Sequence, residues 1–279
     1  MDEGGPAMTE PSKSPASAAP NEPVLLPDLS ERGVLTLTLN RPRVYNALSE
    51  DLLDALKSAL ESAAKDSAVR VVVIRAAGRA VCAGHDLREM RAQPDRAYYT
   101  ALFDRCSAMM QTVTTMPQPV IAQVQGIATA AGCQLVAACD LAIAAETAIF
   151  ATNGLNNGLF CSTPSVALSR AVARKHAFEM LFTGEFISAA RAAEIGLINR
   201  AVPDDELDDA TADLADQIAA KSTVTTRSGK KMFYRQLGLD LEDAYDFAAH
   251  NMACDMMSED AVEGIDAFLE KRAPVWKDR

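Results

Sequence analysis

Two hydrophobic patterns in the first part of the chain predict a strand, a helix and a second strand in succession. Residues 34–39 alternate threonine with aliphatic residues, which is typical of a β-strand, and an Asn-Arg-Pro sequence ends the run. Ser49 is a candidate cap for a helix with acidic residues in its first turn and leucines at helical spacing, namely Leu52, Leu53, Leu56 and Leu60. Residues 69–74 form a continuous apolar run, as expected for a strand covered on both faces.

Strands and helices continue to alternate up to about residue 200, after which helices predominate. The pattern predicts a helix over 97–115, strands over 120–124 and 141–144, and a helix with Thr163 as N-cap and Pro164 behind it. Further helix ends are indicated by two serines and two glycines: Ser188, Ser258, Gly184 and Gly196. This alternation predicts the α/β fold class.

The N-terminal segment differs in composition from the rest of the chain. Residues 1–27 are rich in Pro, Ala, Ser and Glu and poor in large apolar residues, so they cannot bury enough surface to offset the entropy of ordering. They contain acidic residues and one lysine, whereas a mitochondrial presequence is rich in arginine and poor in acids. We therefore expect a disordered tail over 1–27, an α/β core over 28–200 and a helical region over 201–279.

Charge and cysteine usage narrow the range of partners. The 279 residues carry a formal net charge of −11, which disfavours nucleic acid and anionic membrane surfaces as partners. The sequence contains no run of about 18 apolar residues, so it predicts no membrane-spanning helix. The six cysteines form no C-x-x-C pair or His/Cys cluster, so no metal site is predicted, and reduced thiols favour a cytoplasmic protein.

Several common catalytic signatures are absent from the sequence. Neither G-x-G-x-x-G nor G-x-x-x-x-G-K-[ST] occurs, and the G-x-S-x-G nucleophile elbow is missing as well. Hydride transfer, phosphoryl transfer and serine hydrolysis therefore lose their usual sequence support.

Three loops that follow predicted strands carry the informative motifs. They read Asn40-Arg-Pro-Arg-Val-Tyr-Asn-Ala-Leu48, Cys82-Ala-Gly-His-Asp-Leu87 and Gly126-Ile-Ala-Thr-Ala-Ala-Gly-Cys-Gln-Leu135, with Cys139-Asp140 after the third. In this order and spacing they resemble the enoyl-CoA hydratase/isomerase (crotonase) family, from about residue 34 to the C-terminus. Residues 128–134 and 157–164 resemble more closely still the branch of that family named enoyl-CoA hydratase domain-containing protein 3.

The resemblance implies a fold, a ligand and an assembly. The family's fold is a spiral of strand–strand–helix turns followed by a helical trimerisation region. Its ligand is an acyl-CoA thioester, so coenzyme A is expected as part of the substrate, with no permanently bound cofactor. A homotrimer, or a hexamer built as a dimer of trimers, is expected, with lyase or isomerase activity in fatty acid metabolism.

The resemblance also implies an oxyanion hole made of backbone amides. In the family, two such amides hold the thioester oxygen when it becomes an enolate, and by position they belong here to Ala83 and Ala131. Small residues suit these loops because the ligand must approach the backbone closely. A helix N-terminus at the second loop adds partial positive charge where the enolate forms.

The family's pair of acid–base glutamates is missing. The matching positions are Gln134 and Gly154, and neither side chain can transfer a proton at neutral pH. Ordinary hydration of an enoyl-CoA is therefore predicted to be slow or absent. Two residues could substitute: His85 either titrates near pH 7 or is held by backbone hydrogen bonds, and Cys161 is either a nucleophile or an inert buried thiol.

Contacts with coenzyme A carry over from the same resemblance. The residues concerned are Ala47, Leu48, Gly84, His85, Asp86, Phe268 and Lys271. The backbone of the first two matches a segment that lines the CoA groove in the family. Phe268 and Lys271 match C-terminal positions that in relatives reach the adenine in a neighbouring subunit, although Lys271 could equally be a solvated helix end.

Two classes of function remain open from the sequence. In one, the chain is an acyl-CoA enzyme in which Ala83 and Ala131 stabilise an enolate and Gln134 positions water or substrate. In the other, it is a non-catalytic protein on an enzyme scaffold that binds acyl-CoA or regulates a partner. Reactivity of His85 or Cys161 that acyl-CoA blocks would favour the first class.

Overall fold

The computed structural model describes residues 22–279, so most of the predicted N-terminal tail lies outside the described residues. The strands are β1 Leu25–Leu29, β2 Val34–Leu39, β3 Val71–Ala76, β4 Ala80–Cys82, β5 Val120–Val124, β6 Ile127–Thr129, β7 Leu141–Ala145, β8 Ile149–Ala151, β9 Ile187–Ser188 and β10 Arg200–Val202. The helices are α1 Glu50–Lys65, α2 Leu87–Ala92, α3 Arg96–Thr115, α4 Ala131–Ala138, α5 Ser162–Ala171, α6 Arg174–Thr183, α7 Ala189–Glu194, α8 Leu207–Ala219, α9 Thr223–Gln236, α10 Leu241–Asp255 and α11 Glu259–Glu270. Short 3-10 helices are η1 Pro42–Val44, η2 Asn153–Asn157 and η3 Asp204–Glu206.

The chain winds as a spiral through two sheets. One sheet has the order β1-β2-β3-β5-β7-β10, and the other has the order β4-β6-β8-β9. After β1 and β2, which both lie in the first sheet, successive turns place a strand in the first sheet, the next strand in the second sheet and then a helix, as in β5, β6 and α4. Neighbouring turns pair in parallel: β3 with β5, and β4 with β6. The predicted α/β fold class, with helices at the C-terminus, is confirmed.

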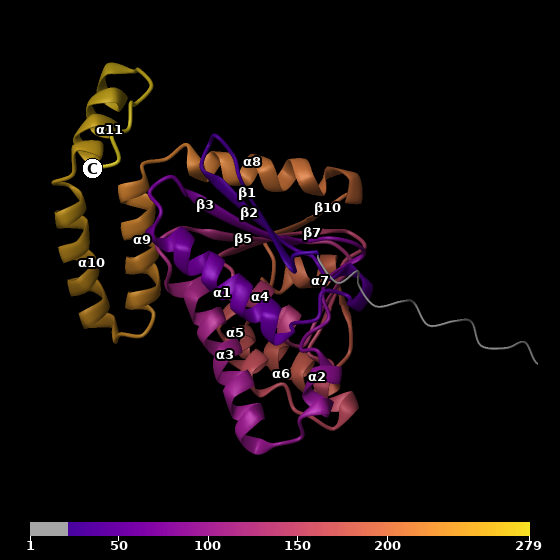
Figure 1. The fold of residues 1–279 in the computed structure, drawn as a ribbon. Helices are drawn as coiled ribbons and strands as arrows, with labels where there is room; N and C mark the ends of the chain where they lie inside the picture. The colour runs from indigo at the N-terminus through magenta and orange to yellow at the C-terminus, as the bar shows by residue number, and fades with distance from the viewer. Residues whose placement is uncertain (1–21) are drawn as a thin grey trace, which may run out of the picture.

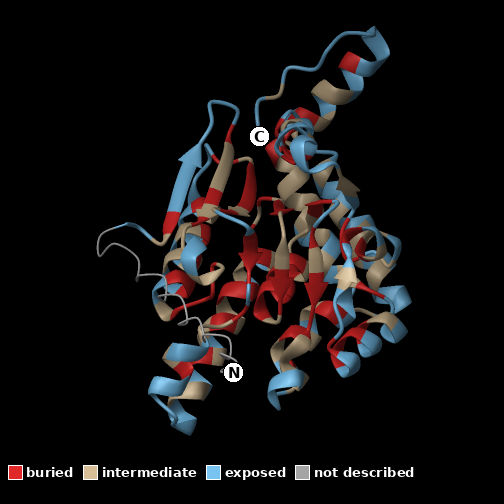
Figure 2. Cartoon of the chain, turned by 90° about the vertical axis from the view of Figure 1, so that its right-hand side faces the viewer, coloured by how far each residue is buried: buried red, intermediate tan, exposed pale blue. Residues whose placement is uncertain are grey.

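Helices cover both faces of the larger sheet (Figure 1). On one face lies α8, whose Ala215 and Ala219 pack on Val71, Val73 and Ile121. On the other face lie α1, α3 and α4, and their apolar residues belong to the largest buried cluster. Buried residues accordingly gather in the strands and on the helix faces that pack against them (Figure 2).

Most of the predicted element ends follow their capping chemistry. Ser49 accepts a hydrogen bond from the amide of Leu52, and Ser188 and Ser258 cap α7 and α11 in the same way. Gly184 ends α6 in the left-handed conformation, with φ +64°, where a glycine is favoured. These predictions are confirmed because each depends on side-chain chemistry local to the helix end.

Three predicted boundaries differ from the structure. β1 begins at Leu25, inside the segment predicted as a tail, because this edge strand tolerates Pro27 and buries only Leu25. The strand predicted over 69–74 is shifted to β3. The N-cap of α5 is Cys161, without a side-chain cap, so Thr163 lies in the first turn instead.

Helices α10 and α11 extend away from the sheets (Figure 1). β10 pairs with β7 and is the last strand, which carries the sheet two residues beyond the predicted limit of residue 200. All residues of α10 are at least partly exposed, including Tyr245 at 71% and Met252 at 70%. A helix with such a surface buries little of its own apolar area against this chain.

Candidate functional site

Two loops that follow β2 and β4 pair along their backbones. The amide of Ala83 donates to the carbonyl oxygen of Tyr45 at 3.0 Å, and the amide of Leu48 donates to Gly84 at 2.8 Å. The amide of Asp86 donates to the carbonyl oxygen of Leu48 at 3.1 Å. Segment 83–86 therefore lies against segment 45–48 like a short parallel strand.

This pairing corrects the prediction for the first oxyanion-hole amide. The amide of Ala83 is already engaged by Tyr45, so it cannot also hold a ligand oxygen. His85 forms a parallel bridge with Leu48, in which its flanking residues make the hydrogen bonds. In such a bridge the N–H of the central residue points away from the paired strand. The amide that faces away from the loop is thus that of His85, two residues further on.

The second amide lies at the start of α4. Ala131 is the first residue of α4, so its N–H has no partner within the helix. The preceding Ala130 has φ 49° and ψ −118°, an unusual conformation for a residue with a side chain, and its amide donates to Ala151 at 2.9 Å. This turn directs the N-terminus of α4 toward the loop that carries His85.

Glycines bring these two loops into contact. A Cβ added to Gly84, which has φ +94°, would lie 3.0 Å from Cβ of Ala130 and 3.4 Å from the nitrogen of Ala131. A Cβ on Gly132 would lie 2.1 Å from the carbonyl oxygen of Cys82, so α4 packs directly on β4. The amides of His85 and Ala131 are consequently neighbours, at a spot that only small residues allow.

Gln134 lies one turn into α4 and is almost fully buried, with 4% exposure. Side chains on a helix lean toward its N-terminus, which carries the Gln134 amide toward Ala131. Its Oε1 is buried and accepts no hydrogen bond from residues 22–279. The hydroxyl of Thr152, just after β8, is buried in the same unpaired state. Unpaired buried polar atoms of this kind are completed by water or a ligand.

The position of the second missing glutamate has no room for a side chain. Gly154 is the second residue of the 3-10 helix η2. A Cβ there would lie 2.4 Å from the carbonyl oxygen of Leu159 and 2.8 Å from Sγ of Cys161. Segment 159–161 therefore fills the space into which a carboxylate at residue 154 would extend. The space of the glutamate side chain is thus occupied by the backbone of Leu159 and the sulfur of Cys161.

The thiol of Cys161 does not have the properties of an activated nucleophile. Burial raises its pKa above the ordinary value, and a hydrogen bond from the backbone amide of Gly154 only partly opposes this effect. A thiol with a raised pKa is protonated at neutral pH and reacts slowly. The structure thus favours the inert reading of the two that the sequence left open.

The ring of His85 matches neither of its two predicted roles. Burial lowers its pKa to about 4, so the imidazole is neutral at pH 7 instead of titrating there. Both ring nitrogens are buried and lack a partner in the described part of the chain, so backbone hydrogen bonds do not hold the ring. The ring packs edge-to-face on Phe103, with centroids 5.5 Å apart, which contributes to its burial.

The remaining predicted contacts with coenzyme A divide into two groups. Ala47 and Leu48 lie beside the site but are 9% and 1% exposed, and both backbone polar groups of Leu48 bond to the neighbouring loop. Phe268 and Lys271 are exposed on and just after α11, at the opposite end of the molecule from α2 (Figure 1). Within one chain the structure does not bring this second pair to the site.

Sequence reasoning missed the side chains that support the first loop. Arg41 donates from Nη2 to Asp86 at 3.0 Å and from Nη1 to the carbonyl oxygen of Ala47. Asn46 is fully buried, and its Nδ2 donates to Ala77 at 2.9 Å and to Ala80 at 2.8 Å. The motif around residues 40–48 contained both residues, but nothing in its spacing indicated their partners.

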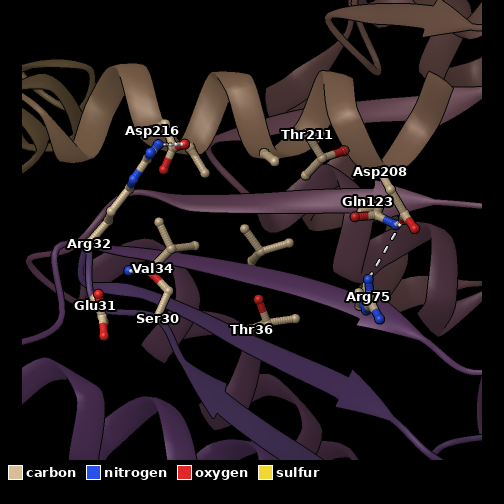
Figure 3. Close-up of a pocket in the computed structure, with 13 residues that line it drawn as sticks. Ser30, Glu31, Arg32, Val34, Thr36, Arg75, Gln123, Asp208, Thr211 and Asp216 are labelled. Carbon is tan, nitrogen blue, oxygen red and sulfur yellow. Dashed lines mark hydrogen bonds and ion pairs between the residues drawn. The ribbon is translucent and has the colours of Figure 1, made fainter.

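A separate hollow of about 460 Å³ lies between α8 and the strands β2, β3 and β5, beside the turn that follows β1 (Figure 3). Two ion pairs flank it, one between Arg32 and Asp216 and one between Arg75 and Asp208 at 3.6 Å. It contains none of the predicted site residues. Across residues 22–279 there is no group of His, Cys, Asp and Glu that could hold a metal ion, and none of the helices is long and apolar enough to cross a bilayer.

Comparison with known proteins identifies the class to which this fold and site belong. Residues 30–279 match the model of the enoyl-CoA hydratase/isomerase family, and the chain belongs to that family. The rat protein named enoyl-CoA hydratase domain-containing protein 3, mitochondrial, is 45% identical over 267 residues, which cover 94% of this chain and 89% of the relative. The predicted resemblance to that branch is confirmed.

Solved structures agree with this assignment. A structure described as enoyl-CoA hydratase from Mycobacterium smegmatis has 57% sequence identity and a TM-score of 0.90, and the match covers 91% of this chain and 99% of that one. The structure of human enoyl-CoA hydratase domain-containing protein 3 has 44% identity and a TM-score of 0.88, with 91% and 100% coverage.

The prediction of a cytoplasmic protein is contradicted. The rat, mouse and human relatives are all named as mitochondrial proteins. The prediction rested on reduced cysteines and on the composition of residues 1–27. Free thiols also persist in other reducing compartments, so the cysteines did not distinguish between these locations.

Proposed function

We propose that the chain binds acyl-CoA thioesters and holds the thioester oxygen between the backbone amides of His85 and Ala131. The observation that carries this proposal is the close approach of the two loops. A Cβ added to Gly84 would lie 3.4 Å from the nitrogen of Ala131, and Gly84 directly precedes the outward-facing amide of His85. Membership of the enoyl-CoA hydratase/isomerase family supports the choice of ligand. His85 thus replaces Ala83 as the first donor.

Two such amides stabilise an enolate more than the uncharged thioester. Negative charge develops on the oxygen when a base removes a proton beside the carbonyl or when a nucleophile adds to the conjugated double bond. Loss of one preorganised donor typically raises such a barrier by about 3 kcal/mol. The N-terminus of α4 adds the partial positive charge of its peptide dipoles at the same place.

Within this proposal, ordinary enoyl-CoA hydration is slow or absent. Gln134 replaces one glutamate, and the chain around Gly154 occupies the space of the other. His85 is neutral and Cys161 is protonated at pH 7, because burial shifts the pKa of each against the charged form. The neutral amide of Gln134 can orient water or substrate, but it cannot act as a general acid or base.

The second candidate is a protein that binds acyl-CoA without turning it over. The occupied space at Gly154 favours it, because segment 159–161 closes the position that a catalytic carboxylate would need. The two candidates share the oxygen-binding amides and differ only in whether a proton is transferred.

We also propose that residues 201–279 form an oligomerisation region and that the chain assembles as a homotrimer or a hexamer. The apolar residues exposed on the last helices support this, among them Tyr245, Met252 and Phe268 at 71%, 70% and 82%. An assembly in which α11 reaches a neighbouring subunit would give Phe268 and Lys271 the role in CoA binding that they cannot have within one chain.

The test follows the enoyl absorbance of a short trans-2-enoyl-CoA after addition of the pure protein. The catalytic candidate predicts only slow turnover, which Ala131→Pro abolishes because proline lacks the amide hydrogen; circular dichroism of the same sample checks that this variant remains folded beside Gly84. Rapid turnover would instead show that the site contains an acid–base group other than Gln134 and Gly154. The binding candidate predicts no turnover but saturable binding of butyryl-CoA on the same sample. Absence of both turnover and binding would refute the proposal.

A further inference from the structure

The loop that carries His85 is held from behind by an ion pair. Nη2 of Arg41 lies 3.0 Å from Oδ2 of Asp86, and Nη1 of the same guanidinium donates to the carbonyl oxygen of Ala47. The side chains of Arg41 and Asp86 are only 21% and 12% exposed. The guanidinium of Arg41 thus links segment 45–48, through Ala47, to segment 83–86, through Asp86. It thereby fixes the distance between the two segments next to His85.

We propose that Arg41 and Asp86 are positioning residues that aim the amide of His85 at the thioester oxygen; this inference rests on the proposed function of the site. The direction of a backbone amide depends on the residues on both sides of it. On one side of His85 lies Gly84, which has φ +94° and, without a side chain, restricts the backbone direction less than other residues would. On the other side lies Asp86, and its carboxylate is the group that Arg41 holds.

The local backbone requires such external support. Tyr45 and Asn46 both have φ 53°, in the left-handed region that non-glycine residues rarely adopt. The amide nitrogen of Arg41 donates to Oδ1 of Asn46 at 2.7 Å, and the amide of Asn46 donates to the carbonyl oxygen of Arg41 at 2.9 Å. Strained residues persist where the surrounding contacts over-determine their conformation, and they concentrate at functional sites.

Asp86 joins three parts of the site. Its carboxylate receives the guanidinium of Arg41, its Oδ1 accepts the amide of Arg88 at 3.1 Å as the N-cap of α2, and its own amide donates to Leu48. Because the pair is mostly buried, water competes with it less than with a surface ion pair. Loss of Arg41 would leave the carboxylate without its strongest partner, and we expect segment 83–86 to shift.

The experiment compares two ligands that differ only in the thioester oxygen. Butyryl-CoA has a carbonyl oxygen, whereas S-butyl-CoA has a methylene group in its place, so only the first can accept hydrogen bonds from the two amides. We expect the wild-type protein to prefer butyryl-CoA roughly tenfold, as measured by isothermal titration calorimetry. Arg41→Met is expected to bind S-butyl-CoA like the wild type and to bind butyryl-CoA no more tightly than S-butyl-CoA.

Variants and a spectroscopic measurement separate positioning from simple loss of structure. Arg41→Lys keeps a cation near Asp86 but cannot reach the carbonyl of Ala47 in the same planar arrangement, so we expect partial recovery of the preference. Asp86→Asn removes the charge that Arg41 holds but keeps an oxygen that can cap α2. This variant replaces Arg41→Met in the binding experiment if Arg41→Met does not fold. In infrared difference spectra of butyryl-CoA with a ¹³C-labelled carbonyl, the shift of the carbonyl band on binding should be smaller in each variant.

The matched control is Arg70→Met. Arg70 forms an ion pair with Asp278 at 2.7 Å, with side chains 22% and 35% exposed, and its other hydrogen bonds go to the carbonyl oxygens of Ala219 and Lys221 rather than to the site loops. This control should lose stability and retain the tenfold preference.

A folded Arg41→Met protein that keeps both the preference and the carbonyl shift would overturn the positioning role. A wild-type protein that binds S-butyl-CoA and butyryl-CoA equally would refute the oxygen-binding amides themselves, and one that binds neither would refute the proposed function as a whole.

Discussion

The ammonium group of Lys230 lies 2.7 Å from Oδ2 of Asp140 and attaches α9 to the edge where β5 and β7 begin. The same ammonium donates to the carbonyl oxygens of Val113 and Gln118 at 2.8 and 2.9 Å. The hydroxyl of Tyr234, one turn further along α9, donates to Oδ1 of Asp140 at 2.7 Å. A mostly buried polar cluster therefore docks the C-terminal helices on the core.

Removal of Lys230 should destabilise the protein strongly. The two side chains are 7% and 14% exposed, so Lys230→Met leaves a buried carboxylate without its cation, which typically costs about 3–5 kcal/mol. Chemical denaturation monitored by circular dichroism measures this loss. The control is Lys57→Met, which removes an exposed pair with Glu61 and should change the stability far less, because water and salt screen an exposed pair. Similar losses in the two variants would show that the buried cluster does not hold the helices in place.

Gly154→Ala should destabilise the protein although it adds only a methyl group. The new Cβ would lie 2.4 Å from the carbonyl oxygen of Leu159, and backbone atoms cannot move aside as a side chain can. Overpacking of this kind typically costs about 1–3 kcal/mol. The matched control is Gly229→Ala in α9, where a Cβ meets no described atom within 4 Å and should stabilise the helix by about 0.5–1 kcal/mol. Thermal unfolding of both variants distinguishes them by the sign of the change, and a stabilised Gly154→Ala would show that the segment yields.

The sequence was sufficient to predict most elements of the fold. Ser49 and the leucines that follow it determine α1 through contacts local to the helix, and the apolar run of β5 was predicted with the observed limits. β1 was missed because the pairing of Leu25 with Leu39 depends on a turn between them, and because Pro27 argues against a strand except at the edge of a sheet.

The candidate site was harder to predict because its geometry depends on partners that are distant in sequence. Arg41 and Asp86 are 45 residues apart, and no local pattern pairs them. The motif located the loop with Ala83 and His85, but only the hydrogen bond to Tyr45 shows which amide is engaged. The neutral state of His85 likewise depends on burial against Phe103, which belongs to a different helix.

Asp260→Asn should loosen the C-terminal segment. Asp260 is only 2% exposed. Its carboxylate accepts hydrogen bonds from the backbone amides of Lys277 and Asp278 at 2.7 and 3.0 Å. An asparagine side chain offers one acceptor oxygen in place of two, so one of these amides loses its partner at a cost of about 1–3 kcal/mol. Hydrogen exchange should become faster at the amides of residues 277 and 278. The exposed residue Asp266 provides the control, and Asp266→Asn should leave both exchange rates unchanged.

Stability of the folded protein should fall as the pH decreases from about 6.5 to about 4, in part because of His85. Burial lowers the pKa of this imidazole from 6.5 to about 4, so the unfolded chain takes up a proton at a higher pH than the folded protein does. Protonation of the unfolded state within this window favours unfolding, by up to about 3 kcal/mol at its lower end. Below about pH 4 the folded protein is protonated as well, and this contribution stops growing. Urea denaturation at pH 7.5 and pH 4.5 measures the difference, and His85→Gln, which cannot be protonated, should reduce the loss on acidification. An equal loss in His85→Gln and the wild type would show that His85 takes up its proton at the same pH in the folded and unfolded states.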